Sequence, residues 1–101
     1  MSVTFERSSD DQQLTINIKG RFDFSKHQEF RSAYERPDAA AKRYLVDLKE
    51  TSYLDSSALG MLLLLRDHAG GDHADVRLIN CNADVIKILT ISNFSKLFKI
   101  G

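Results

Sequence analysis

The opening of the chain alternates apolar and polar residues with the period of two that is typical of a half-buried strand. The alternation occupies residues 3–5 and returns over residues 14–18. The polar stretch between them, residues 8–11, has the Ser/Asp composition of a turn. The pattern therefore predicts a hairpin, and Gly20 is expected to break its second strand.

A helical period follows the hairpin. The apolar residues at helical spacing are Phe30, Ala33 and Tyr34. Ser25 is expected to cap this helix, with Gln28 three residues later completing a capping box. Pro37 is expected to end the segment, because proline interrupts helical hydrogen bonding.

The run Tyr44–Leu48 is almost continuously apolar. Strands that are covered on both faces have this composition, so we expect this strand at the centre of the sheet. Residues 76–79 have the same character and predict a further strand.

A second helix is predicted from about Ser57 to Ala69, ended by the glycine pair at 70–71. Its first half is apolar almost all round, so one face must enter the core and another is left exposed or covered by a partner. Asn82 is expected to cap a third helix, and the apolar tail 94–100 is expected to be ordered.

The predicted order is β-β-α-β-α-β-α over 1–101, a single domain. Strands that alternate with helices favour parallel pairing through right-handed crossovers. Together with the antiparallel hairpin, this order predicts an α/β fold. We expect a mixed sheet of four to five strands with helices mainly on one face.

Charge and composition reduce the number of possible functions and partners of the chain. The 14 basic residues balance 14 acidic ones, so no electrostatic feature points to nucleic acid. The longest apolar run, residues 58–65, is far shorter than the roughly 20 residues of a membrane span. The single cysteine, Cys81, and an amino terminus unlike a signal peptide favour a cytoplasmic location.

The sequence contains no clear motif of a catalytic site. The serines near residue 56 lack the Gly-x-Ser-x-Gly spacing of a hydrolase, and His27, His68 and His73 are scattered. No paired His or Cys spacing predicts a metal site, and no glycine-rich loop predicts a nucleotide cofactor. We therefore expect a binding protein rather than an enzyme, with no cofactor.

The turn Asp55-Ser56-Ser57 stands between the expected central strand and the most apolar helix. Functional groups gather at such junctions in open α/β sheets, and an anion is stabilised at a helix amino terminus. From spacing alone, a simple helix cap is the better explanation of these residues.

Two strings of residues carry a family resemblance. The longer one joins Leu45–Leu48 to Tyr53–Gly60 and includes Asp55-Ser56-Ser57-Ala58-Leu59-Gly60, and the shorter one is Gly20–Asp23. With the order of elements, they resemble the STAS domains of bacterial anti-sigma factor antagonists over essentially the whole chain. Ala58 departs from the many members that have glycine there. The resemblance implies the STAS fold.

The resemblance also implies a switch between partners. In that family the serine directly after the aspartate is phosphorylated by an anti-sigma factor that is itself a serine protein kinase. The matching residue here is Ser56, with Ser57 as the second candidate. The unphosphorylated form binds the kinase and releases a sigma factor, and a metal-dependent serine phosphatase resets the system. An alternative within the family is an unphosphorylated lipid-transport subunit that docks on a transporter ATPase.

The expected partner surface is centred on the turn after the central strand. Its residues are Asp55, Ser56, Ser57 and Ala58, joined by Asp23 and Phe24 from the neighbouring loop and by Met61 from the exposed side of the second helix.

Overall fold

A five-stranded mixed sheet forms the centre of the computed structural model, which describes residues 2–10, 12–36 and 41–101. The strand order is β1-β2-β4-β6-β7. The strands are β1 (Val3–Arg7), β2 (Gln13–Ile18), β4 (Arg43–Asp47), β6 (Val76–Ile79) and β7 (Lys99–Ile100). β1 pairs antiparallel with β2, and the other pairs are parallel. The predicted mixed α/β sheet is confirmed.

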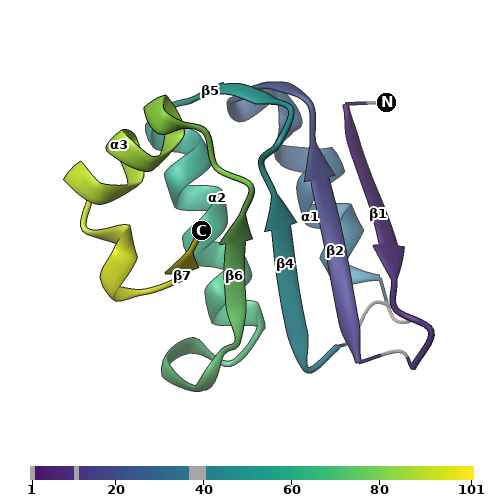
Figure 1. Ribbon diagram of the computed structural model, residues 1–101. Helices are drawn as coiled ribbons and strands as arrows, with labels where there is room; N and C mark the ends of the chain where they lie inside the picture. Colours follow the sequence, from purple (N-terminus) through teal and green to yellow (C-terminus); the bar gives the residue numbers. More distant parts are fainter. Residues whose placement is uncertain (1, 11, 37–40) are drawn as a thin grey trace.

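Three α-helices connect these strands in the described part of the chain. They are α1 (His27–Glu35), α2 (Ser56–His68) and α3 (Ala83–Ile91), with 3₁₀ turns η1 (Phe24–Lys26), η2 (Gly71–His73) and η3 (Phe94–Lys96). In Figure 1, α1 and α2 lie behind the sheet, and α3 lies to the side of β6. One face of the sheet is therefore covered by helices and the opposite face is open.

The open face corrects one sequence prediction. Tyr44, Val46 and Leu48 are buried, as expected of the central strand. However, Leu45 and Asp47 are only half-buried, because they point to the open side of the sheet. β4 is therefore central in the sheet, as predicted, but helices cover only one of its faces.

A small second sheet was missed by the sequence prediction. It consists of β3 (Gly20–Phe22) and β5 (Thr51–Leu54), which pair in parallel. Gly20 has a φ of +82°, a conformation that glycine adopts without strain, and it redirects the chain from β2 into β3. The buried Thr51 hydroxyl donates to the Ile18 carbonyl over 2.8 Å and ties β5 to β2. Strands of three and four residues are too short to show a period.

The first helix begins differently from the prediction. Asp23, and not Ser25, provides the capping side chain, and it caps η1. α1 then starts at His27 without a side-chain cap. The predicted core face of Phe30, Ala33 and Tyr34 is confirmed. Pro37 lies outside the described residues.

The other helix boundaries agree with the sequence. Gly70 and Gly71 follow α2 with φ values of +122° and +62°. The Asn82 side chain accepts a hydrogen bond from the Val85 amide over 2.9 Å and caps α3. The tail is ordered, since Phe94 and Phe98 are buried and stack on each other.

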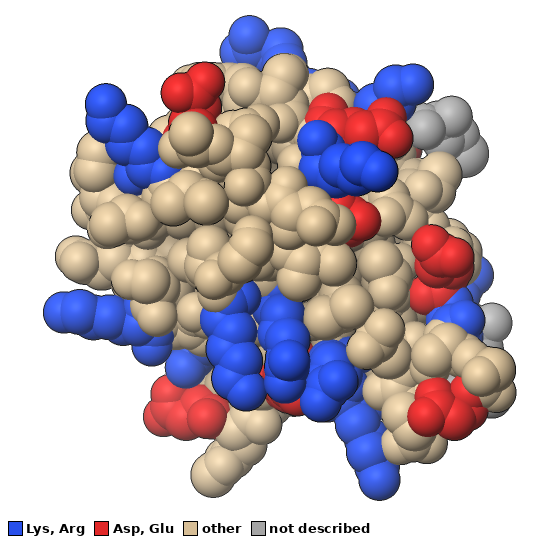
Figure 2. Space-filling model, in the orientation of Figure 1, with Lys and Arg blue, Asp and Glu red and all other residues tan. Residues whose placement is uncertain are grey.

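Charge is unevenly spread although the whole chain is neutral. Figure 2 shows a band of basic side chains across the lower part of the open face. Asp75 accepts hydrogen bonds from both Arg43 and Arg77, at 3.0 and 3.1 Å. No helix within residues 2–10, 12–36 and 41–101 combines the length and apolar character needed to cross a membrane.

Thr51 provides a test of how the small sheet is attached. In Thr51→Val the shape is kept but the Ile18 carbonyl loses its buried donor. The free energy of unfolding in urea should fall by about 1–3 kcal/mol. Ser52→Ala, at the exposed neighbouring position, should change it by less than about 0.5 kcal/mol. Equal stability of Thr51→Val and wild type would show that the hydrogen bond does not hold β5 in place.

Candidate functional site

Two strand ends lie side by side at the site. β3 and β5 are parallel, with Phe22 opposite Leu54, and the Asp55 amide donates to the Phe22 carbonyl over 3.4 Å. The residues that follow these strands, Asp23 and Asp55, therefore emerge next to each other. The predicted adjacency of the two loops agrees with this geometry.

Asp55 caps α2 with its carboxylate. Its Oδ1 accepts from the Ala58 amide at 3.0 Å and from the Ser57 hydroxyl at 2.6 Å. The pKa of Asp55 is lowered, chiefly by the Ser57 hydroxyl and then by the Ala58 amide, while partial burial and the nearby charge of Asp23 oppose the shift. The carboxylate is therefore anionic at neutral pH.

Asp23 repeats this arrangement one loop away. Its carboxylate accepts from both the hydroxyl and the amide of Ser25, and the hydroxyl is the main cause of its lowered pKa. The middle residue of each Asp-x-Ser unit is exposed. It is Phe24 in one loop and Ser56 in the other. Phe24 is 69% exposed and stacks on His27.

The two serines of the turn differ in availability. Ser57 is half-buried, and its hydroxyl donates to the capping carboxylate of Asp55. Ser56 is exposed as the first residue of α2, and its hydroxyl has no hydrogen-bond partner among the described residues. Ser56 is therefore the serine of the turn that an incoming group reaches without breaking the cap.

Arg21 and Tyr53 border the turn and were missed by the sequence prediction. The Arg21 guanidinium lies 4.8 Å from the centre of the Tyr53 ring, and its Nε is 3.7 Å from an Asp23 oxygen. The two residues are opposite each other in β3 and β5. Without that pairing, nothing in the sequence brings them together.

Two predicted surface residues turn inward. Met61, expected on the exposed side of α2, is only 4% exposed, and Ala58 is fully buried. Both belong to the helix face that packs in the core with Leu62 and Leu65. The outer face of α2 carries Gly60, Leu63 and Leu64 instead.

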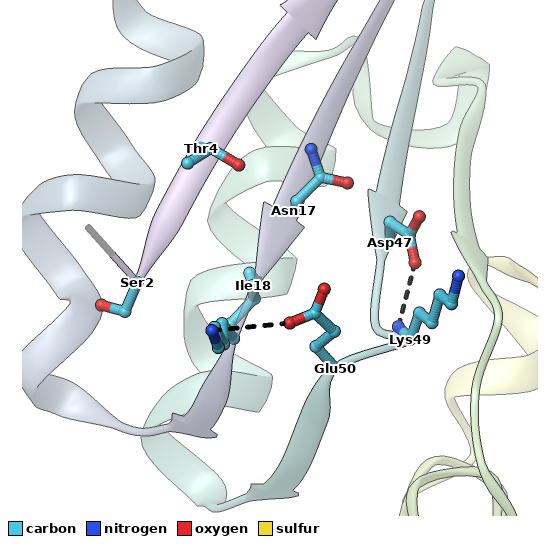
Figure 3. Close-up of a pocket in the computed structure, with 8 residues that line it drawn as sticks. Ser2, Thr4, Asn17, Ile18, Asp47, Lys49 and Glu50 are labelled. Carbon is cyan, nitrogen blue, oxygen red and sulfur yellow. Dashed lines mark hydrogen bonds and ion pairs between the residues drawn. The ribbon is translucent and has the colours of Figure 1, made fainter.

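A polar hollow of about 350 Å³ lies elsewhere, on the open side of the sheet (Figure 3). It is lined by Ser2, Thr4, Asn17, Ile18, Lys19, Asp47, Lys49 and Glu50. Lys19 pairs with Glu50 at 4.0 Å, and Asp47 accepts from the Lys49 amide. Its mixed charges select no single class of ligand. In the part of the chain that is described, no three His, Cys, Asp or Glu residues gather as a metal site.

Comparison with known proteins gives a consistent result. The family model described as "Mlab, STAS domain" matches residues 5–99. A STAS-domain containing protein of Pseudomonas aeruginosa (strain UCBPP-PA14) is 62% identical over 101 residues, covering all of both chains.

Solved structures share the fold at low sequence identity. The anti-sigma factor antagonist SpoIIAA in its unphosphorylated form is 17% identical, with a TM-score of 0.78 over 98% of this chain and 87% of that one. The Bacillus SpoIIAA in its phosphorylated form is 16% identical, with a TM-score of 0.67 over 98% and 90%. A putative anti-sigma factor antagonist from Thermotoga maritima is 15% identical, with a TM-score of 0.81 over 97% and 84%.

Removal of the Asp55 cap should cost stability in a pH-dependent way. We expect Asp55→Ala to lower the free energy of unfolding by about 1 kcal/mol at pH 7. Because the folded-state pKa of Asp55 is lowered, its contribution is complete above the ordinary aspartate pKa. That contribution disappears as the pH falls through the folded-state pKa. The difference between wild type and Asp55→Ala in urea should therefore shrink once the pH is lowered below the ordinary aspartate pKa of about 4.

Two variants control this measurement. Asp55→Asn keeps a side-chain oxygen for the Ala58 amide but has no titratable group, so its difference from Asp55→Ala should not change with pH. Asp67→Ala, at the exposed far end of α2, should have little effect at either pH. A difference between wild type and Asp55→Ala that stays constant from pH 7 to pH 2 would contradict the assignment.

Proposed function

The chain belongs to the STAS domain family, and on that premise we propose that it is an anti-sigma factor antagonist controlled by phosphorylation of Ser56. It acts as a cytoplasmic binding protein rather than as an enzyme. The observation that carries the proposal is the exposed Ser56 hydroxyl at the start of α2, beside an Asp55 carboxylate that is already engaged. The fold shared with SpoIIAA, which has been solved in both phosphorylation states, supports it.

The chemistry of the switch is a phosphoryl transfer. The Ser56 oxygen attacks the γ-phosphorus of ATP held by the kinase partner, an O–P bond forms, and the bond to ADP breaks. The serine proton passes to a base on the kinase, because Asp55 is bound to Ser57 and Ala58 and its lowered pKa makes it a poor base. This chain supplies the acceptor and its rigid position.

The acceptor turn tolerates the phosphate without a change of fold. A phosphoserine carries about −1.5 to −2 charge, which the amino terminus of a helix stabilises. At an interface the same dianion must lose its water, and the carboxylates of Asp23 and Asp55 add repulsion. A 100-fold loss of affinity requires only about 2.7 kcal/mol. Phosphorylation therefore releases the partner at the interface itself.

Ser56 is preferred over Ser57 on geometric grounds. Phosphorylation of Ser57 would remove a hydroxyl donor from the Asp55 carboxylate and place a dianion beside it. Phosphorylation of Ser56 leaves both capping hydrogen bonds in place. A metal-dependent serine phosphatase would then restore the binding form.

A second candidate function keeps the surface but needs no phosphate. The chain would be a lipid-transport STAS subunit that docks on a transporter ATPase. The unmodified chain is compatible with this function, because Asp55 caps the start of α2 without any phosphate. Such a complex should be unaffected by Ser56→Asp.

Phosphate mapping tests the acceptor directly. The kinase-type anti-sigma factor is incubated with ATP and the wild-type, Ser56→Ala or Ser57→Ala chain, and phosphate is located by mass spectrometry. We expect modification at Ser56 in wild type, its loss in Ser56→Ala, and its retention in Ser57→Ala. Equal phosphate on wild type and Ser56→Ala would overturn the assignment.

Affinity purification tests the switch in the host cell. Ser56→Ala and Ser56→Asp chains serve as matched baits, and retained proteins are quantified by mass spectrometry. We expect an anti-sigma factor on Ser56→Ala and at least about a 100-fold weaker complex with Ser56→Asp. Circular dichroism of the two baits should be the same. A transporter ATPase held equally by both baits would support the second candidate instead.

A further inference from the structure

Cations gather on the open face of the main sheet, at the amino ends of its parallel strands. Arg43 begins β4, Arg77 is the second residue of β6, and Lys99 begins β7 opposite Arg77. We call these three residues the basic cluster. Figure 2 shows basic side chains gathered in the lower part of this face. A chain with equal numbers of basic and acidic residues therefore concentrates part of its positive charge on one surface.

Asp75 holds two members of the basic cluster in place. Its two carboxylate oxygens accept hydrogen bonds from Nε of Arg43 at 3.0 Å and from Nε of Arg77 at 3.1 Å. A guanidinium has five N–H donors, and the remaining donors of these two arginines bond to no described residue. The two arginine side chains stay 44% and 33% exposed. One carboxylate thus orients two arginines and leaves most of their donors available to a second anion.

Apolar side chains adjoin the basic cluster on the same face. Leu45 is opposite Arg77 in the register of β4 and β6, and Ile79 lies two residues beyond Arg77 in β6. Both are only half-buried, and no helix of the described residues covers them on this side. Asp47, opposite Ile79, already accepts two hydrogen bonds, and Glu6 lies on β1, two strands away from β4. The surface is therefore apolar in its centre and basic at one end.

The chemistry of this surface favours an acidic protein segment over other anionic partners. A nucleic acid would place successive phosphates on the basic cluster, where the Asp75 carboxylate between the two arginines repels them. Insertion into a membrane requires apolar side chains that project, whereas Leu45 and Ile79 are half-buried within the sheet. A second copy of this chain, docked face to face, would bring two basic clusters together.

We propose that the open face of the main sheet docks an acidic amphipathic helix of a partner protein. Its carboxylates bind the basic cluster, and its apolar residues pack on Leu45 and Ile79. A helix suits the surface because the opposite face of the same sheet is already covered by α1 and α2. Arginine also matches a carboxylate well, since two parallel N–H groups of one guanidinium can bind its two oxygens.

This surface is separate from the Ser56 turn. Arg43 lies at the amino end of β4, whereas Ser56 follows β5, which continues from the carboxyl end of β4. In Figure 1, β5 crosses the upper edge of the sheet, and the amino ends of β4 and β6 lie at the lower edge. The proposal does not depend on phosphorylation of Ser56, and the chain can hold two partners at the same time.

A synthetic peptide tests the surface on the full chain. The probe is a helical peptide with glutamates along one side and leucines beside them, and its matched control has glutamine at every glutamate position. Binding is located from backbone amide shifts in NMR spectra and quantified by titration. We expect shifts on β4, β6 and β7 with the glutamate peptide, an affinity that falls as salt is added, and much weaker binding of the glutamine peptide.

Charge reversal tests the basic cluster itself. Lys99 is exposed and makes no hydrogen bond or ion pair with a described residue, so Lys99→Glu should leave the fold unchanged. It should weaken binding of the glutamate peptide by about 5-fold or more. Lys87→Glu, the same change on the exposed side of α3, should bind like wild type. Leu45→Gln should also weaken binding, and Lys99→Glu decides if that variant loses its native circular dichroism.

Several results would overturn the proposal. They are an absence of shifts with the glutamate peptide, shifts confined to α2 or the Ser56 turn, and equal affinity of wild type and Lys99→Glu. Tighter binding of duplex DNA or of phosphatidylserine vesicles than of the glutamate peptide would assign the basic cluster to a different ligand. A dimer of the wild-type chain that Lys99→Glu dissociates in sedimentation would show that the occupant is a second copy.

Discussion

The pairing of β3 with β5 is the constraint on which the rest of the site depends. It is short, and it is fixed from outside by the Thr51 hydroxyl on Ile18 and by the amide of Gly20, which donates to the Glu50 carbonyl. Because the two strands are parallel and in register at their ends, the aspartates that follow them emerge together. Without this pairing, the Asp55 turn would be an ordinary helix cap with no neighbouring loop.

The sequence predicts most of the main sheet and the helices, because their buried faces repeat over enough residues to show a period. It does not predict β3 and β5, whose three and four residues pair across a long separation in the chain. Because the pairing of β3 with β5 is not predicted, the contact of Arg21 with Tyr53 is not predicted either. The burial of Met61 is not predicted either, because the sequence of a helix that is apolar almost all round does not show which side faces the core.

Asp55 caps α2 and, in the proposed switch, also stands beside the acceptor serine. It accepts two hydrogen bonds that lower its pKa further, and those bonds hold the first turn of α2. The negative charge of the capping Asp55 carboxylate would repel a phosphate added to the neighbouring serine at an interface. Ser57 is drawn into the cap, which leaves Ser56 as the outward hydroxyl. In the proposed switch, the choice of Ser56 over Ser57 as the acceptor thus follows from the geometry of the cap.

The outer face of α2 is where the sequence departs from what the isolated fold favours. Gly60 weakens a helix in which alanine would fit, and Leu63 and Leu64 expose apolar surface without a packing role as prominent as that of Leu62. Local choices that oppose stability concentrate at functional surfaces. The cost is tolerable because Ala58, Leu62 and Leu65 anchor the opposite face of the same helix in the core. One helix can therefore be rigid on its inner side and suited to a partner on its outer side.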